Sequence, residues 1–324
     1  MRGEKMAIVI GLGEGMVRLS PPDHQRLEQA SYLEVQIGGA ELNVAVALAQ
    51  LGVDSAWISK LVDSPIGRLI TNRARQYGVD ISRVVWTRTG RVGLYFLEVG
   101  AAPRPNLVIY DRKQSAINYL TADELDWEFI GNARVMHLTG ITLGLSENAR
   151  QLMRDVVQRL RKLGVSISFD INYRSKLWSP QEAREELLRL LPQVDILFAT
   201  RDDVETVLGI TGDAEEMVRT LRREFASIAA FLTMGSEGAM VCANDNEIHY
   251  QSPFTIVEVD RLGAGDAFAA GALLGWLDGA SWQRALAYAV AMAAFKYSIP
   301  GDFAIIERNE LDALLSQGIQ AVQR

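Results

Sequence analysis

"SENARQLMRDVVQRLRKLGVSISFD", residues 146–170, decides the fold class because it joins an amphipathic helix directly to a short apolar strand. Ser146 is a good N-cap, leucine and valine keep one apolar stripe along the helix, and Gly164 supplies its C-terminal stop. The strand at 166–170 follows at once. Helices and strands that alternate in this way are typical of a parallel sheet with right-handed crossovers.

The alternation continues on both sides of this stretch. Further helices are predicted at 40–52 and 180–191, and further strands at 7–10, 55–62, 195–199 and 229–235. The sequence therefore predicts an α/β fold with a doubly wound, mainly parallel sheet and helices on both faces. Because no linker or short repeat interrupts the pattern, we expect a single domain over 1–324.

Two regions alternate with period two and contain no helix. They are "MVRLSPP" (16–22) with "YLEVQIGG" (32–39), and "RVGLYFLEVG" (91–100) with "NLVIYDR" (106–112). We expect them to form a small antiparallel sheet inserted at about 14–37 and 91–112. Since an exposed sheet edge or face is a liability, this sheet should cover a site or pair with another subunit.

Composition and charge narrow the possible partners. A net charge of −7 argues against general affinity for nucleic acid or an anionic membrane. The single cysteine, Cys242, excludes an internal disulfide and fits a reducing compartment. The N-terminal apolar run is too short for a signal peptide, and the run at 285–295 is about half a membrane span. These features predict a cytoplasmic protein whose ligands are small molecules.

Several common kinds of site are absent from the sequence. Gly11-x-Gly13 follows the first strand, but Met16 stands where a dinucleotide fingerprint needs a third glycine, so a simple bend is preferred. There is no G-x-S-x-G and no Walker A loop. The three histidines, His24, His137 and His249, have no metal-ligand spacing.

The segment "DRLGAGDAFAAGALLG", residues 260–275, is the most specific candidate for chemistry. Gly263 and Gly265 let successive backbone N–H groups point one way at the start of a helix, which with Ala264 makes an anion hole for a phosphoryl group. Asp266 could accept a proton from a substrate hydroxyl. It could equally cap the helix, for about 1 kcal/mol. The segment alone leaves both interpretations open.

Basic residues follow two of the predicted strands. Arg112 lies in "YDRKQSA" (110–116), and Arg174 lies in "FDINYRSKLW" (169–178). Open α/β sheets bind ligands at the carboxyl ends of their strands, so the two arginines could grip a carboxylate or phosphate, or be simply solvated. Asp170 could bind a metal ion or cap a turn.

Two stretches resemble the signatures of a known family, and the resemblance extends over nearly the whole chain. "GGAELNVAVALAQLG" (38–52) and 260–275 are similar to the first and second motifs of the ribokinase-like (PfkB) carbohydrate kinases. The resemblance implies a sugar kinase that uses ATP and Mg²⁺, with Asp266 as the catalytic base. It also implies that the projecting sheet is a lid over the sugar and, in a dimer, the contact between subunits.

Three stretches resemble the 2-keto-3-deoxygluconate kinases within that family. They are "IGLGEGMVRLSP", "YDRKQSA" and "FDINYRSKLW". This resemblance implies phosphorylation of the 6-hydroxyl of a sugar acid, and a pair of arginines suits an acid better than a neutral sugar. The alternatives are a kinase for fructose, for another neutral sugar or for the galactonate epimer, and a non-catalytic sugar-binding protein on the same scaffold.

The resemblance also assigns roles to individual residues. Sugar hydroxyls would meet Gly38, Gly39 and Asn43, and the keto-acid end would meet Tyr95, Tyr110, Arg112 and Arg174. The nucleotide would lie along Thr200, Gly235, Gly238, Gly263 and Gly265. Asp203 is the candidate metal ligand, although Thr200-Arg-Asp-Asp203 stands where the family usually has Asn-x-x-Glu. Likewise Asp260-Arg261-Leu262 replaces the common Asp-Thr-Thr.

Overall fold

The computed structural model describes residues 8–243 and 247–318, and its central sheet is doubly wound and mainly parallel, as the sequence predicts. The order of its eight strands is β14-β13-β12-β11-β10-β9-β1-β4. The six neighbouring strands β12, β11, β10, β9, β1 and β4 run parallel, and β13 and β14 add an antiparallel edge. The strands are β1 (Val9–Leu12), β4 (Ser55–Ile58), β9 (Val135–Thr139), β10 (Ser166–Asp170), β11 (Ile196–Thr200), β12 (Ala229–Thr233), β13 (Ala239–Ala243) and β14 (Ile248–Gln251).

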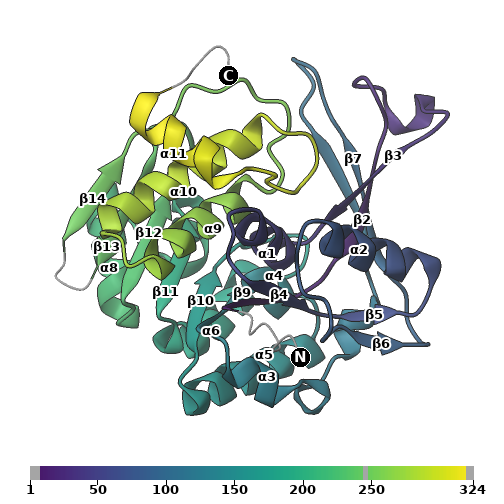
Figure 1. Cartoon of the computed structure of the whole chain (residues 1–324), viewed down its shortest axis with the longest axis horizontal. Helices are drawn as coiled ribbons and strands as arrows, with labels where there is room; N and C mark the ends of the chain where they lie inside the picture. The colour runs from purple at the N-terminus through teal and green to yellow at the C-terminus, as the bar shows by residue number, and fades with distance from the viewer. Residues whose placement is uncertain (1–7, 244–246, 319–324) are drawn as a thin grey trace.

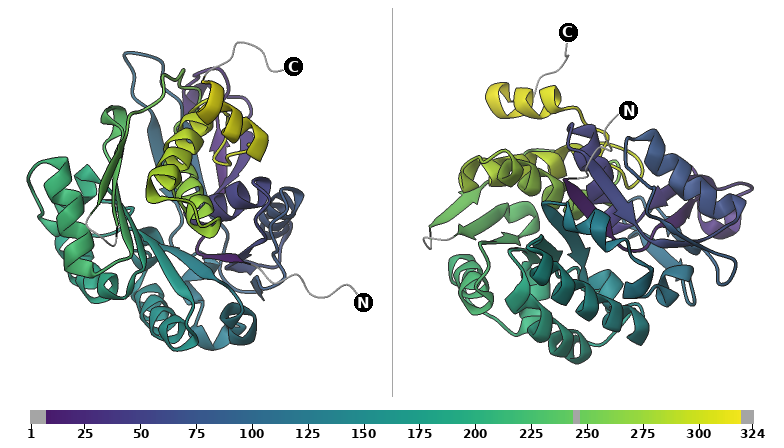
Figure 2. Two further views of the ribbon diagram at one scale, coloured as in Figure 1. Left: turned by 60° about the vertical axis from the view of Figure 1, so that its left-hand side comes forward. Right: turned by 60° about the horizontal axis from the view of Figure 1, so that its bottom comes forward.

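Helices cover both faces of this sheet, as the right-hand view of Figure 2 shows with yellow helices on one side and teal helices on the other. One core lies under α3 (Trp127–Gly131), α5 (Glu147–Leu163), α6 (Pro180–Leu190) and α8 (Ala214–Phe225). The opposite core lies under α1 (Ala40–Gln50), α9 (Ala264–Leu277), α10 (Trp282–Tyr297) and α11 (Arg308–Gln317). The short helices α4 (Gly140–Leu143) and α7 (Arg201–Asp203) follow strands β9 and β11.

Local sequence determines most of these elements. Helix α5 begins where predicted, with the Ser146 hydroxyl accepting a hydrogen bond from the Ala149 N–H, and it ends at Gly164 with φ of 73°. The strand predicted at 55–62 is instead two strands. After β4 the chain leaves the central sheet, and β5 (Lys60–Val62) pairs with β6 (Val85–Thr87). Residue 7, the predicted start of the first strand, lies outside the described residues.

The projecting sheet has the order β3-β2-β7-β8 and extends from the upper right of the body in Figure 1. Its strands are β2 (Met16–Ser20), β3 (Glu34–Gly38), β7 (Gly93–Glu98) and β8 (Leu107–Asp111). The two hairpins are antiparallel as predicted, and the central pair that joins them, β2 with β7, is parallel. The base of the sheet packs against α1 and α2 (Pro65–Gln76) through Val17, Ile37 and Ile70.

The projecting sheet, which is called the lid sheet from here on, has two different faces because its strands are pleated. Arg18, Tyr95 and Tyr110 are paired across neighbouring strands, so they share one face, and Arg18 and Tyr95 are buried. The next row along the strands, on the other face, is apolar and consists of Val35, Leu19, Phe96 and Ile109. We call this second row the outer face of the lid.

In the described part of the chain, no helix combines the length and the apolar character that crossing a membrane requires.

Candidate active site

Asp266 lies at the entrance to α9, near the carboxyl ends of the parallel strands. The N-cap of α9 is Gly263, whose φ of 84° is in the left-handed region. A Cβ at this position would lie 2.0 Å from the Asp302 backbone oxygen, so the turn requires glycine. The Asp266 carboxylate does not cap the helix: it accepts a hydrogen bond of 2.7 Å from Asn43 Nδ2.

The electrostatics of Asp266 suit a proton acceptor. Its side chain is buried, and burial raises the pKa of the carboxyl group to about 6, while the hydrogen bond from Asn43 and the charge of Arg174 act in the opposite direction. The group is therefore ionised at neutral pH and still more basic than an exposed aspartate. Next to it, Gly265 is exposed and a Cβ there would meet open space, so an anion can approach the helix start.

The residues predicted to meet sugar hydroxyls surround the same place. Asn43 is 4% exposed, and its Oδ1 is buried and has no hydrogen-bond partner among the described residues, although its Nδ2 donates to Asp266. A Cβ on Gly38 would lie 2.3 Å from an Asp302 carboxylate oxygen, and one on Gly39 would lie 2.1 Å from the Glu14 carbonyl oxygen. The turn into α1 therefore passes too close to its neighbours for any larger residue. A contact with sugar stays a prediction for all three.

The two predicted arginines have different surroundings. Arg112 is buried, and its guanidinium is bound by Glu14, with Nε 2.7 Å from Glu14 Oε2. Arg174 is exposed and donates from Nη1 to the neighbouring Tyr173 carbonyl at 3.2 Å. Its charge also lowers the pKa of Asp266, which places it near the base. Of the pair, Arg174 is the guanidinium that a ligand can reach directly.

The rings of the two predicted tyrosines lie side by side on the lid sheet, tilted by 34° to one another. Tyr95 and Tyr110 have ring centroids 5.9 Å apart, and Tyr110 is 37% exposed whereas Tyr95 is 3% exposed. The Tyr95 hydroxyl donates to Asp302 Oδ2 at 2.5 Å, so Tyr95 could meet a ligand only as an acceptor. Lys176 donates to the Val108 carbonyl at 2.7 Å and ties the loop after β10 to the lid. Tyr110 therefore lines the boundary between lid and body.

Two carboxylates lie at the ends of neighbouring strands β10 and β11. Burial raises the pKa of Asp170 well above its usual range, and the charge of Asp203 raises it further. Burial also raises the pKa of Asp203, whose backbone N–H donates to the Thr200 hydroxyl at 3.0 Å. Within the described ranges, no three His, Cys, Asp or Glu residues are grouped to hold a metal ion. The pair nevertheless fits Mg²⁺, which commonly takes one or two carboxylates together with substrate phosphates.

The predicted nucleotide-binding glycines form the turn between β12 and β13. Gly235 has φ of 57° and Gly238 has φ of 89°, and Gly235 is exposed. An apolar cavity of about 210 Å³ lies between residues 254–257 and the helices α10 and α11. The segment 254–257 precedes the start of α9 in the sequence by a few residues. None of the predicted nucleotide residues lines this cavity, which is large enough for a flat aromatic base.

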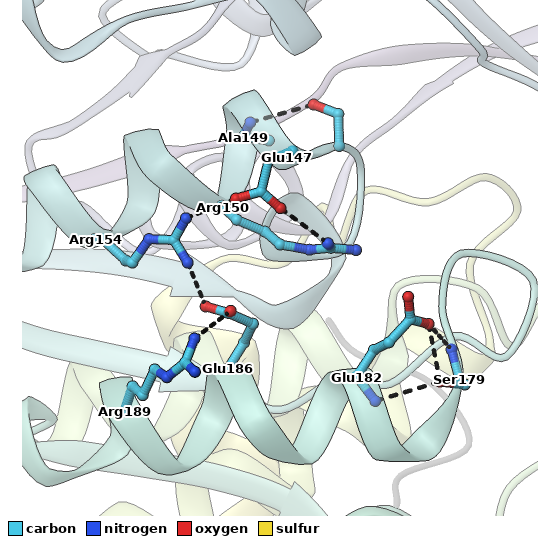
Figure 3. Close-up of polar contacts among 9 residues, drawn as sticks. Glu147, Ala149, Arg150, Arg154, Ser179, Glu182, Glu186 and Arg189 are labelled. Carbon is cyan, nitrogen blue, oxygen red and sulfur yellow. Dashed lines mark hydrogen bonds and ion pairs between the residues drawn. The ribbon is translucent and has the colours of Figure 1, made fainter.

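A larger cavity, of about 390 Å³, lies between α5 and α6, and none of the predicted site residues lines it. Figure 3 shows that two of its arginines are paired, Arg154 with Glu186 and with Glu147 outside the lining, and Arg189 with Glu186. The carboxylate of Asp155, which also lines the cavity, accepts a hydrogen bond from Gln151 at 2.9 Å. With its charges satisfied in this way, the groove is a solvated helix–helix boundary.

Sequence reasoning missed the buried charges around the site. Glu41 accepts hydrogen bonds of 2.7 Å from both Thr139 and Thr142, and burial raises its pKa to about 7. Five others were not assigned a role: Glu14, Arg18, Asp260, Lys296 and Asp302. Lys296 carried a signal, because it interrupts an apolar helix and is fully buried. Arg18 carried another, as the charged residue of the short strand Met16–Ser20.

The chain is similar to known proteins over nearly its whole length. The sequence profile described as "pfkB family carbohydrate kinase" matches residues 6–307. The 2-dehydro-3-deoxygalactonokinase of Haloferax volcanii is 39% identical over 98% of this chain and 99% of its own length. The 2-dehydro-3-deoxygluconokinase of Thermoproteus tenax is 32% identical over 92% of this chain and 91% of its own. A crystal structure of 2-dehydro-3-deoxygluconokinase from Thermotoga maritima superposes with a TM-score of 0.90, at 35% identity, covering 95% of this chain and 98% of that one.

Proposed function

Because this chain belongs to the pfkB family of carbohydrate kinases and is a sugar kinase, we propose that it phosphorylates the 6-hydroxyl of a 2-keto-3-deoxy sugar acid with ATP. The first candidate is 2-keto-3-deoxygluconate, which is the same compound as 2-dehydro-3-deoxygluconate. The observation that carries the proposal is the pair of Asn43 and Asp266 at the open start of α9.

In the proposed reaction Asp266, Asn43 and the backbone at the start of α9 each have a different role. The Asp266 carboxylate accepts the proton of the sugar hydroxyl while that oxygen bonds to the γ-phosphorus, and the bond from this phosphorus to the bridging oxygen breaks to release ADP. The backbone N–H groups of 263–265 and the positive end of α9 stabilise charge on the phosphoryl oxygens. Asn43 keeps the carboxylate oriented, and its Oδ1, which has no partner in the described part of the chain, can accept a hydrogen bond from a sugar hydroxyl.

Three other features of the described chain support the use of ATP and Mg²⁺. The apolar cavity between 254–257 and α10 offers the adenine an apolar contact, and its lining segment leads directly into 260–263. Asp203, with Asp170 beside it, would hold Mg²⁺, which when bound neutralises charge on the phosphates. In the turn between β12 and β13, Gly235 is exposed and leaves its backbone open to a nucleotide, whereas Gly238 is buried.

An acidic substrate is favoured over a neutral one by Arg174. This guanidinium is exposed and close to Asp266, and its one hydrogen bond within the described ranges is to the Tyr173 carbonyl at 3.2 Å. In a protein of net charge −7, a carboxylate needs such a local positive group. Arg112, bound to Glu14, would contribute by sharing its remaining donors rather than as a free charge.

The lid sheet also predicts an oligomer. On its outer face Val35 is 48% exposed and Ile109 is 44% exposed, and Leu107 beside them is 46% exposed. We propose that this face pairs with a second copy of the chain in a dimer.

A substrate panel tests the proposal. ADP release is measured with ATP and Mg²⁺ and, in turn, 2-keto-3-deoxygluconate, its galactonate epimer and fructose. We expect kcat/KM to be roughly tenfold or more higher for one of the two keto acids than for fructose, because an uncompensated loss of one charge-assisted contact is of that size. A preference for fructose would contradict the proposal of an acidic substrate but would leave the kinase activity itself standing. No turnover of any sugar, with binding retained in calorimetry, would favour a sugar-binding protein on this scaffold.

A further inference from the structure

Arg18 on the lid is inserted between two acidic residues of the loops that surround the start of α9. Its side chain is 4% exposed, with Nη2 2.7 Å from Asp260 Oδ2 and Nη1 2.9 Å from Asp302 Oδ1. Its Nε donates to the Ser20 hydroxyl at 3.0 Å, which fixes the plane of the guanidinium. Strand β2 is thereby joined to two segments that are distant from it in the sequence, the farther by 284 positions.

Asp260 holds the loop that leads into the anion hole. Its carboxylate accepts hydrogen bonds from the backbone N–H of Leu262 at 3.1 Å and of Gly301 at 3.0 Å. Its carbonyl oxygen accepts from Lys296 Nζ at 3.1 Å, and the same ammonium donates to the Ile299 carbonyl at 2.8 Å. One carboxylate and one ammonium therefore fasten 260–262 to 299–301.

Asp302 contacts the anion hole itself. A Cβ on Gly263 would lie 2.0 Å from the Asp302 carbonyl oxygen, so the two backbones touch at the N-cap of α9. The Asp302 carboxylate receives Arg18 on one oxygen and the Tyr95 hydroxyl on the other. A displacement of Asp302 would therefore displace Gly263 and, with it, the N–H groups of the anion hole.

The presence of four buried charged groups is better explained by the positions in which they hold two loops than by a contribution to the stability of the fold. Arg18 and Lys296 balance Asp260 and Asp302, and all four side chains are buried. Buried ion pairs are often no more stabilising than an apolar replacement, because the charges lose their hydration. What an arginine offers here is its rigid fork, which reaches two carboxylates on two different loops in a fixed direction.

We propose that Arg18 is a positioning residue that fixes the anion hole from the lid, through Asp260 and Asp302. The seating of the lid on the sugar and the geometry of the phosphoryl site are thereby coupled. The kinetic part of this inference rests on the proposed kinase function, whereas its structural part does not.

The test compares Arg18→Met with Arg104→Met. Arg104 is also paired with a lid carboxylate, Glu98 at 3.2 Å, but its hydrogen bonds and ion pairs within the described chain do not reach 260–263 or 299–302. We expect Arg18→Met to lower kcat roughly 10- to 100-fold with KM for the sugar changed less than about threefold, because the misplaced N–H groups act in the transition state. Arg104→Met should leave both near wild type. A rise in KM at unchanged kcat would overturn the proposal.

Amide hydrogen exchange gives a readout that does not require turnover. In Arg18→Met, but not in Arg104→Met, peptides covering 260–266 should exchange faster than in the wild type. Unchanged exchange at 260–266 would overturn the proposal whatever sugar the enzyme uses. If instead the wild type turns over no sugar while exchange responds as expected, the proposed function fails and the positioning role stands.

A charge-balanced double variant separates positioning from stability. Arg18→Met with Asp302→Asn removes one positive and one negative charge, and the Asp260 carboxylate keeps its two backbone donors. We expect the double variant to melt closer to the wild type than Arg18→Met does, while its kcat stays low. Recovery of kcat together with the melting temperature would show that Arg18 serves charge balance alone, and would overturn the proposal.

Discussion

At the scale of the residue, Asp266 combines a buried location with an altered pKa. Burial holds its pKa at about 6, against 3.8 for an ordinary aspartate. Replacement by asparagine keeps the size of the side chain but removes proton acceptance. We expect Asp266→Asn to lower kcat about 10²–10⁴-fold, measured by ADP release.

The same substitution should stabilise the fold at neutral pH. Since the folded pKa is raised, the folded protein binds a proton more tightly than the unfolded chain, and stability falls as pH rises from about 4 through about 6. The amide of the variant cannot ionise, so Asp266→Asn should unfold in urea at about pH 8 with a free energy higher by up to about 3 kcal/mol. The gain should vanish near the unfolded pKa, at about pH 4. An active variant would contradict the assignment of Asp266 as the base. A variant that is less stable than the wild type at the higher pH would contradict the raised pKa of Asp266.

The pH dependence of the wild type follows from the same group. We expect kcat/KM to fall on the acid side with a midpoint near pH 6, because a protonated Asp266 cannot accept the hydroxyl proton. The Asn43 hydrogen bond lowers this pKa, so Asn43→Ala should move the midpoint to higher pH. Glu41, whose pKa burial raises to about 7, is the nearby alternative. If Glu41→Gln, and not Asn43→Ala, moves the midpoint, the assignment to Asp266 is wrong.

At the scale of the element, the sequence predicts what depends on local patterns. Helix α5, with its cap at Ser146 and its stop at Gly164, follows from periodicity and end signals. The two lid hairpins follow from period-two alternation. The split of the predicted strand at 55–62 does not, because the departure of β5 from the sheet depends on its pairing with β6, which is distant in sequence.

The candidate site shows the same division. Asp266, Gly263 and Gly265 were identifiable because helix-start chemistry is local, whereas Asn43 and the glycines before it were identified only through the resemblance to a family, which also supplied the roles. The partners of the arginines were not identifiable. Glu14 meets Arg112 across 98 positions, and Arg18 meets Asp302 across 284. Such pairs are set by the packing of the lid on the body, and a single sequence carries no signal for them.

The loop after β10 carries the prediction about acid recognition. Arg174→Ala should raise KM for a keto acid roughly tenfold or more and leave KM for a neutral sugar within about twofold, since the loss is that of a charge-assisted contact. Lys176→Ala is the matched control, because Lys176 lies in the same loop but donates to the Val108 carbonyl. Equal effects of Arg174→Ala on both sugars would count against a carboxylate contact.

At the scale of the whole molecule, the lid's outer face predicts self-association. Val35, Leu19, Phe96 and Ile109 form a continuous apolar row across four strands. We expect light scattering to report twice the chain mass of 35.8 kDa, and Ile109→Glu to report the monomer, because a charge in an apolar interface is costly. If the wild-type protein is monomeric at chain concentrations of tens of micromolar, the outer face of the lid is not a dimer contact.

The central claim, that this family member phosphorylates a keto sugar acid at its terminal hydroxyl, is tested most directly by identifying the product. The enzyme is given ATP, Mg²⁺ and equal concentrations of 2-keto-3-deoxygluconate, its galactonate epimer and fructose, and the products are read by phosphorus-coupled NMR. We predict that the first phosphate ester to accumulate is on the 6-oxygen of a keto acid, and that Asp266→Asn forms none in the same time. A first product on fructose, or on another oxygen of the acid, would contradict the account.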